Sequence, residues 1–270
     1  MILSTRRARG QAQTTSCLRV VPSMSMELGV AKFSLTILGD QYECSASLPD
    51  GPVQVSQLLP VIFAITDLVV GVQTGASLQD GDSISCRAGC GACCRQAVPI
   101  TRAETWFIAG LVASLDEDRR REIESRFNAA LTRLEESGLL AVFEGEDISD
   151  PATVRNLAFH YFNLGIPCPF LEDESCSIHE ARPLRCREYL VKSPAENCAN
   201  PFGLPLRPVP MPVRPSEALA YIGRGDESAP PAFMPLVLAL KWVARQREPE
   251  PAMPAPEILN NFLAALTTDR

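Results

Sequence analysis

The alternation of apolar and polar residues predicts two short strands near the start of the chain. Residues 32–38 alternate apolar side chains with serine and threonine, which is the period of a half-buried strand. Residues 42–48 alternate in the same way, and Cys44 follows the apolar positions, so we interpret it as a core thiol. Gly39 and Asp40 lie between the two stretches and suit a tight turn. The pattern therefore predicts a short N-terminal β-hairpin.

Helical spacing of apolar residues dominates the rest of the chain. Apolar residues from Val55 to Val70 recur every three or four positions and predict a buried helix, with Pro60 in its first turn or at a kink. Gly75 to Gly81 is interpreted as a loop, and the prolines of 205–215 and 249–256 as extended connectors. Further helices are expected after the capping box Thr101–Glu104, from Asp116 to Gly138, from Asp150-Pro151 to Leu164, after Pro235 with Leu236, Leu240, Val243 and Ala244 buried, and over Ile258–Leu266.

These elements predict an α+β protein that is mainly helical, with a loop-rich cysteine cluster holding its second half. Apolar residues make up 46% of the 270, which is enough for a substantial core. We divide the chain into a flexible leader or over-long start (1–26), a hairpin plus helix (27–82), a cysteine-cluster domain (83–200), and proline-rich connectors with C-terminal helices packed on the same unit (201–270).

Charge and hydropathy limit which partners the protein binds and in which cellular compartment it is expected. The formal net charge of −7 argues against general nucleic-acid binding, which needs a concentrated basic surface. The longest apolar stretch, Leu58 to Val72, is shorter than a membrane span, so no membrane helix is expected. Residues 1–26 contain four arginines and no acidic residue, but no continuous apolar run of a secretory signal; Met24 and Met26 offer later starts. We therefore expect a cytoplasmic protein.

Eight of the ten cysteines fall into two groups, which predict a metal site. Clustered thiols in a reducing compartment indicate metal ligands or redox groups rather than a disulfide framework. Arginines next to cysteines, at positions 87, 95, 185 and 187, can offset thiolate charge. The two groups are Cys86, Cys90, Cys93 and Cys94, and, far downstream, Cys168, Cys176, Cys186 and Cys198.

The type of metal stays open at this level. Eight thiols suffice for two four-coordinate zinc sites, and iron–sulfur clusters also take four cysteines. The adjacent Cys93 and Cys94 point in different directions, so they serve two metals more easily than one, unless one of them has another role. The expected cofactor is thus zinc or iron, with an iron–sulfur cluster as one form, and the metal ion is the expected partner; no protein partner is indicated.

Both cysteine groups and their flanks resemble a known family. Cys86-x3-Cys90-Gly-Ala-Cys93-Cys94, followed by Ile-Pro-Cys168-Pro-Phe-Leu and by Cys176-Ser-Ile-His-Glu-Ala-Arg-Pro-Leu-Arg-Cys186-Arg-Glu-Tyr, is similar to the YkgJ-type cysteine-cluster family over about residues 84–200. The resemblance implies a zinc- or iron-chelating domain, with Cys198 as a less fixed addition to its cluster. It implies that the other seven cysteines of the two groups form that cluster: Cys86, Cys90, Cys93, Cys94, Cys168, Cys176 and Cys186. The family usually has tyrosine where this chain has His179, which argues against His179 as a ligand. His160 is interpreted as a surface or packed histidine.

Three roles remain for such a site: metal binding alone, a cluster-dependent enzyme, and a thiol redox sensor. The spacing Cys86-x3-Cys90-x2-Cys93 matches that of radical S-adenosylmethionine enzymes, but Ala92 stands where an aromatic residue is expected. Similar clusters occur in bacterial flagellin lysine methylase, which makes methyl transfer an alternative. The adjacent Cys93 and Cys94 favour the redox alternative. Arg182 and Arg185 can bind a phosphate or carboxylate, or simply position Cys186 and balance thiolate charge.

Overall fold

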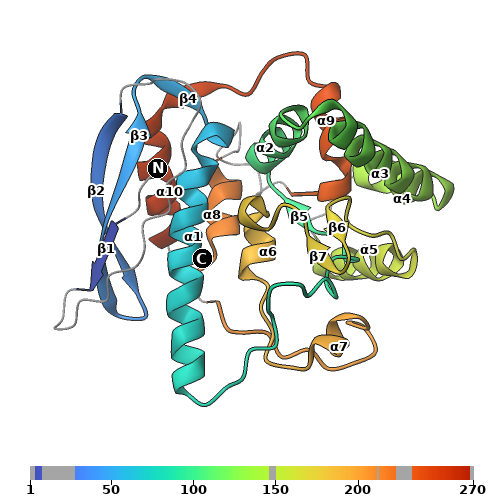
Figure 1. Cartoon of the computed structure of the whole chain (residues 1–270), viewed down its shortest axis with the longest axis horizontal. Helices are drawn as coiled ribbons and strands as arrows, with labels where there is room; N and C mark the ends of the chain where they lie inside the picture. Colours follow the sequence, from blue (N-terminus) through green and yellow to red (C-terminus); the bar gives the residue numbers. More distant parts are fainter. Residues whose placement is uncertain (1–3, 8–27, 146–149, 212, 223–232, 268–270) are drawn as a thin grey trace.

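The computed structural model of the chain describes residues 4–7, 28–145, 150–211, 213–222 and 233–267. Within them the protein is mainly helical with small antiparallel sheets, which confirms the predicted fold class. A sheet and a long helix occupy one side of the molecule, and the helices around the cysteine segments occupy the other (Figure 1).

The N-terminal sheet has the strand order β1-β3-β2, with β1 at Ser4–Arg7, β2 at Leu28–Ile37 and β3 at Asp40–Pro49. The predicted hairpin is β2–β3, in the register that pairs Ile37 with Asp40. Its turn is Leu38-Gly39, both with positive φ, one residue earlier than expected. Strand β1 falls within the predicted leader; Cys17, Met24 and Met26 lie outside the described residues.

The long helix α1, Val55–Gln79, runs further than the sequence pattern predicted. The expected loop from Gly75 to Gly81 was wrong, because the helix continues to Gln79 and only the last two residues of that stretch form a turn beyond it. Pro60 lies inside the helix rather than in its first turn. Leu59, Ile62 and Ile65 are fully buried, and they anchor α1 in the core.

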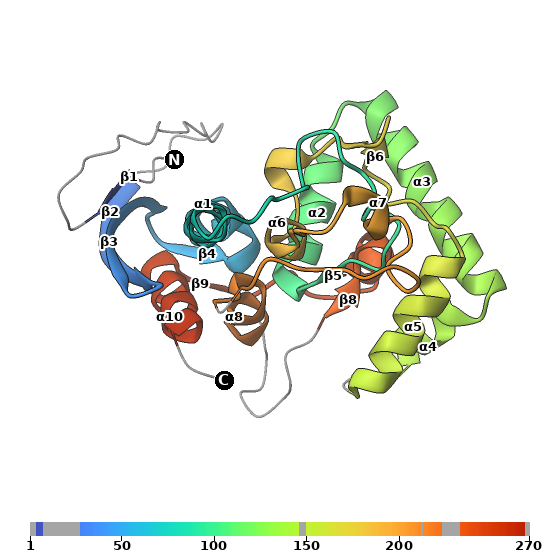
Figure 2. The ribbon, with the colours of Figure 1, turned by 90° about the horizontal axis from the view of Figure 1, so that it is seen from below.

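Helix α1 is long and apolar enough to cross a membrane by length and composition alone. Of its most apolar window, 61% is buried inside the protein, as for the core helix of a folded domain. Its buried side chains share one core cluster with β2, β3 and α10 (Ala255–Thr267), and the sheet curves around α1 and α10 in Figure 2. The expectation of no membrane helix was based on the length of the apolar stretch, and that reason was wrong, because α1 is long enough.

Four helices connect the two cysteine groups, and three of their starts were predicted. Thr101 caps α2, where the predicted capping box with Glu104 is present; Asp116 caps α3 and Asp150 caps α5. The short α4 was not predicted. The four helices are α2 (Arg102–Ala113), α3 (Glu117–Glu136), α4 (Leu139–Gly145) and α5 (Pro151–Asn163).

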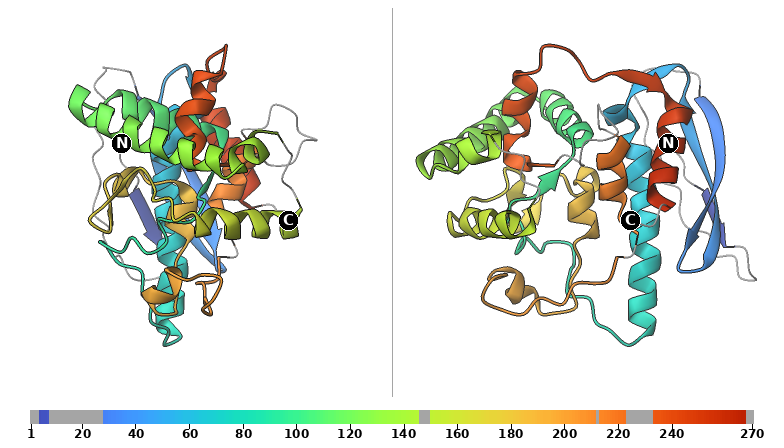
Figure 3. Two further views of the ribbon diagram at one scale, coloured as in Figure 1. Left: turned by 90° about the vertical axis from the view of Figure 1, so that its right-hand side faces the viewer. Right: turned by 180° about the vertical axis from the view of Figure 1, so that it is seen from behind.

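The C-terminal segment pairs with both halves of the chain. Strand β9 (Ala252–Pro254) pairs with β4 (Pro52–Gln54), and β8 (Met234–Pro235) pairs with β5 (Pro99–Ile100). Helix α8 (Pro215–Ile222) contacts α10, and Figure 3 shows both beside α1. The predicted helix after Pro235 is a 3-10 turn, η2 (Leu236–Leu238), continued by α9 (Ala239–Ala244).

The sequence pattern misplaced the buried face of the helical stretch that η2 and α9 form. Leu236 is buried as expected, but Ala244 is exposed, whereas Val237, Leu238 and Ala239 are buried. The reason is the 3-10 start, whose three-residue turn shifts the side chains relative to an α-helix. In α10 the buried face is as predicted, with Ile258, Leu259, Phe262 and Leu266 in the core.

Candidate metal centre

The first cysteine group lies in an irregular loop of successive turns between α1 and β5. The amide of Cys90 donates to the carbonyl of Arg87 at 3.2 Å, and that of Cys94 donates to Gly91 at 2.9 Å. Gly89 has a φ of 77°, a conformation that glycine adopts without strain. Such tight turns present several thiols within a short length of chain.

The second cysteine group is spread over three small elements. Strands β6 (Leu171–Glu172) and β7 (Ser175–Cys176) form a hairpin after Cys168, with Asp173 and Glu174 at positive φ in its turn. Cys186 lies in the middle of the short helix α6 (Leu184–Glu188). Cys198 ends α7 (Ala195–Cys198) and is buried.

The backbone holds the two groups against each other. The amide of Cys168 donates to the carbonyl of Cys94 at 2.7 Å, which joins the first loop directly to the second group. The amide of Val191, beyond α6, donates to the sulfur of Cys86 at 3.3 Å. A Cβ added to Gly91 would lie 2.6 Å from Leu171 Cδ1 in β6, so the loop and the hairpin meet where only glycine fits.

Electrostatic interactions link each of the eight predicted thiols to at least one other thiol. The thiolate charge of Cys93 raises the pKa of six others, and Cys90 acts on Cys86 and Cys198 in the same way. The structure thus brings every predicted ligand into one region. The six affected by Cys93 are Cys86, Cys94, Cys168, Cys176, Cys186 and Cys198.

Burial is the main cause of the raised thiol pKa values. It raises the pKa of Cys168 to about 12 and that of Cys198 to about 11, and that of Cys186 well above its ordinary range. Cys93 is the exception, because a hydrogen bond from the Cys94 thiol lowers its pKa to about 7. Most of these thiols therefore carry protons at neutral pH unless a cation replaces the protons.

The donor set suits zinc or iron, although the thiols are not arranged as a finished ligand group. In the part of the chain that the structure describes, no three cysteine, histidine or acidic side chains stand in a group ready to hold a metal ion. The chemistry fits nonetheless, since thiolates are the ligands of zinc and of iron–sulfur centres. Buried N–H groups of Gln96, Arg182 and Arg185, each in a cysteine-bearing segment, have no hydrogen-bond partner.

The arginine whose charge acts on thiols of both groups is Arg182, which is not one of the four expected arginines. Arg95 pairs with Glu174 at 3.0 Å and Arg185 with Glu217 at 3.3 Å. Arg182 instead lowers the pKa of Cys86, Cys93 and Cys176 through its charge. Of the four expected arginines, Arg95 interacts electrostatically with Cys94, and Arg187 lowers the pKa of Cys176.

Helix α6 fixes Cys186 because buried groups hold both of its ends. One carboxylate oxygen of Glu104, on α2, accepts a hydrogen bond from the amide of Leu184 at 2.7 Å. Glu188 accepts from the amide and hydroxyl of Ser216, at the start of α8, at 2.6 and 2.7 Å. Desolvation raises the pKa of both carboxyl groups. The sequence showed Glu104 only as a capping residue, and its second role depends on a contact with a residue 80 positions away.

The two histidines are exposed, and Cys44 lies in the N-terminal core. His179 is exposed, and its Nε2 lies 2.7 Å from Nη1 of Arg182; since arginine only donates, this nitrogen accepts. His160 is exposed on α5. Cys44 is buried in the N-terminal core as expected, and burial raises its pKa to about 11.

Comparison with known proteins identifies the cysteine-bearing part of the chain. Residues 85–201 match the family model described as "CxxCxxCC: Putative zinc- or iron-chelating domain". No curated protein and no solved structure matches the chain. The matched range begins one residue before Cys86 and ends three residues after Cys198, so it contains both cysteine groups and the helices between them. The segment from residue 85 to residue 201 is therefore similar to the CxxCxxCC family of cysteine-cluster domains.

Proposed function

We propose that this domain binds zinc or iron through thiolates drawn from both cysteine groups. The observation that carries the proposal is the hydrogen bond from the Cys168 amide to the Cys94 carbonyl, which places the two groups side by side. The mutual effect of the thiolate charges on their pKa values supports it, because a cation would relieve that repulsion. The proposed ligands are Cys86, Cys90, Cys93, Cys94, Cys168, Cys176, Cys186 and Cys198.

The metal determines the chemistry. Bound zinc would supply structural cohesion, whereas an iron–sulfur cluster would supply an electron carrier. The protein's own part is to hold the thiols together, to screen them from water and to balance their charge. A reducing cytoplasm, which we propose as the compartment, would keep the thiols available for metal.

The test is anaerobic purification followed by metal analysis and a visible spectrum. Zinc gives no colour, and an iron–sulfur centre gives a broad band at roughly 400 nm. Cys90→Ser and Cys186→Ser are expected to lower the metal content, while Cys44→Ser leaves the metal content unchanged because Cys44 lies in the separate N-terminal core. A native protein without metal in which all eight thiols titrate freely would overturn the proposal.

A thiol redox role is the second candidate, and the Cys93–Cys94 pair favours it. The pKa of Cys93 is lowered to about 7 because the neighbouring thiol donates to it, so a substantial fraction is thiolate at neutral pH. Alkylation of the metal-free protein should then modify Cys93 first. Equal alkylation rates for Cys93 and Cys198 would exclude this candidate. Detection of an iron–sulfur cluster would instead give weight to methyl transfer as the activity to assay.

A further inference from the structure

Three buried N–H groups without an acceptor lie in the cysteine-bearing segments. They are Nε2 of Gln96, Nε of Arg182 and Nε of Arg185. Gln96 lies close enough to Tyr189 to lower the pKa of its hydroxyl, so the two arginines are the stronger cases. Because a buried donor without an acceptor costs free energy, their presence near one site indicates that an acceptor belongs there.

Arg182 is the better placed of the two arginines. The Nε–H of each arginine lacks an acceptor, but Arg185 already bonds to Glu217 at 3.3 Å and lies over the ring of Phe233, whereas Arg182 contacts His179 through Nη1. The charge of Arg182 also acts on thiols of both cysteine groups, namely Cys86 and Cys93 from the first and Cys176 from the second.

The backbone around Arg182 is held from outside the cysteine site. Nε of Arg187 donates to the carbonyl of Arg182 at 2.9 Å, and Nη2 of Arg187 donates to the carbonyl of Glu180. Pro183 favours the extended conformation that Arg182 has, with φ −61° and ψ 146°. The side chain of Arg182 therefore starts from a fixed point, which is what a directional hydrogen bond requires.

We propose that Arg182 is a positioning residue of the metal centre, whose buried Nε–H donates to a metal-bound thiolate sulfur while its charge offsets that of the ligands. The proposal rests on the proposed metal-binding function. Groups that hydrogen-bond metal ligands typically change metal affinity by about 10- to 100-fold when removed. His179 then has a secondary part, since it accepts from Nη1 and so orients the guanidinium.

The test compares Arg182→Gln and Arg182→Lys with the natural full-length protein. Affinity for Co²⁺ and zinc is measured by competition with a chelator, and the sulfur-to-cobalt charge-transfer band reports the thiolate ligands directly. Arg182→Gln is expected to bind about 10- to 100-fold more weakly with unchanged stoichiometry, and Arg182→Lys, which keeps a cationic donor, to recover most of the affinity. The charge-transfer band should shift in Arg182→Gln, a change that a purely structural role would not produce.

Arg121→Gln is the matched control, because Arg121 is an exposed arginine on α3 that pairs with Asp118 of the same helix at the surface. It should bind metal as the natural protein does. Wild-type affinity and an unshifted band in Arg182→Gln would overturn the role of Arg182. If Arg182→Gln fails to fold, weak binding with an unshifted band in Arg182→Lys overturns that role as well. Absence of metal binding in the natural protein would instead refute the proposed function itself.

Discussion

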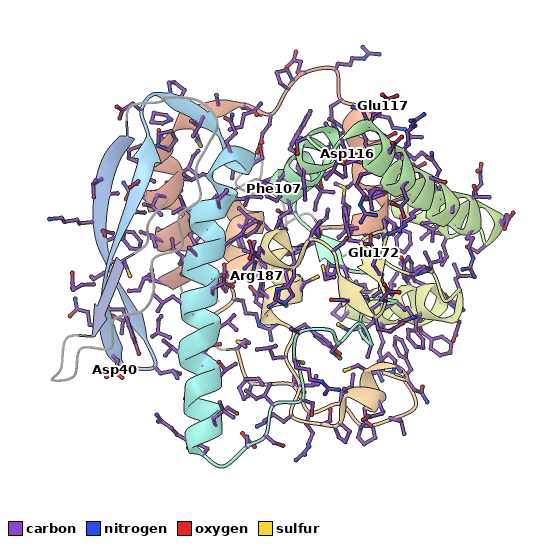
Figure 4. All side chains as sticks on the ribbon, in the orientation of Figure 1. Asp40, Phe107, Asp116, Glu117, Glu172 and Arg187 are labelled. Carbon is purple, nitrogen blue, oxygen red and sulfur yellow. The ribbon has the colours of Figure 1, made fainter. Side chains whose placement is uncertain are left out.

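Nη1 of Arg187 lies 2.7 and 2.8 Å from the two carboxylate oxygens of Asp67, although the residues are 120 positions apart. Arg187 belongs to α6 and Asp67 to α1, and Figure 4 shows Arg187 between the two helices. The guanidinium also lies over the ring of Phe63, 4.3 Å from its centroid. This side chain links the helix that carries Cys186 to the long helix of the N-terminal core.

Removing the two partners of this ion pair should have unequal effects. The Arg187 side chain is 4% exposed and that of Asp67 is 53% exposed. Arg187→Leu leaves the carbonyls of Glu180 and Arg182 without their donor, so we expect a loss of about 2–4 kcal/mol in the free energy of unfolding. Asp67→Asn should cost less, about 1–2 kcal/mol, because Arg187 keeps its two carbonyl acceptors and asparagine still accepts from Nη1, although the buried guanidinium loses its counter-charge. Urea denaturation measures both, and equal losses would show that the buried carbonyls do not depend on Arg187.

Gly91→Ala should loosen the contact between the first cysteine loop and the β6–β7 hairpin. The added Cβ would lie 2.8 Å from the carbonyl oxygen of Glu174 as well as close to Leu171, so backbone must shift. We expect a loss of about 1–3 kcal/mol in stability together with weaker metal binding. Melting temperature and chelator competition report the two effects.

Gly89→Ala separates this steric effect from backbone strain. Gly89 has a φ of 77° with nothing within 4 Å of an added Cβ, so the substitution should cost only about 1 kcal/mol. Metal affinity should fall less than in Gly91→Ala. The reverse order of affinities would mean that the contact with the hairpin does not shape the site.

Glu104 should make the protein less stable as pH rises. Burial raises the pKa of its carboxyl group above the ordinary 4.5, so between the unfolded and folded pKa values the folded state binds more protons than the unfolded state. The stabilisation from protonation is therefore complete below the unfolded pKa and is lost as pH rises through the folded pKa.

The comparison that isolates Glu104 is with Glu104→Gln, which cannot titrate. Denaturation from about pH 5 to about pH 8, at matched metal saturation, should show the stability advantage of the natural protein over Glu104→Gln shrinking as pH rises. A growing advantage would mean that the two backbone donors and the charge of Arg185 hold the carboxyl group ionised instead.

Metal removal should increase the hydrogen exchange of residues 84–200 more than that of the N-terminal sheet. A thiolate-bound metal contributes on the order of 10 kcal/mol, which is comparable with the stability of a whole domain. Hydrogen exchange after chelation should therefore rise most around α6, β6 and β7, and less in β2 and β3. Cys17→Ser should change neither metal content nor exchange, and uniform exchange throughout the chain would contradict the prediction.

Sequence patterns predicted helix starts correctly where interactions between residues close in sequence determine them. Thr101, Asp116 and Asp150 cap helices as expected because side-chain capping depends on residues only three positions apart. The end of α1 was missed, since Gly75 lies inside the helix, four residues before its end, where burial of Gln73 and Ser77 outweighs the low helix propensity of glycine. The start of α9 was misjudged because a 3-10 turn precedes it.

The candidate ligands could be proposed from the sequence, but the side chains that contact the arginines around them could not. Cysteine spacing and the family resemblance selected eight thiols, and electrostatic interactions link them across the two groups. The partners of the arginines were not predictable, because Asp67, Glu174 and Glu217 come from distant segments. Residues that lie in contact only after folding leave no local pattern, and Arg182 is the clearest case.

The pairing of β5 with β8 means that the unit of sequence similarity is smaller than the unit of folding. Ile100 and Phe127, inside the matched range, share a core cluster with Leu236 and Ala239 outside it. Leu184 belongs to the core cluster of α1 and α10. A protein cut to residues 85–201 would expose these apolar faces to water and aggregate, so heterologous expression of the cysteine cluster requires the flanking chain on both sides.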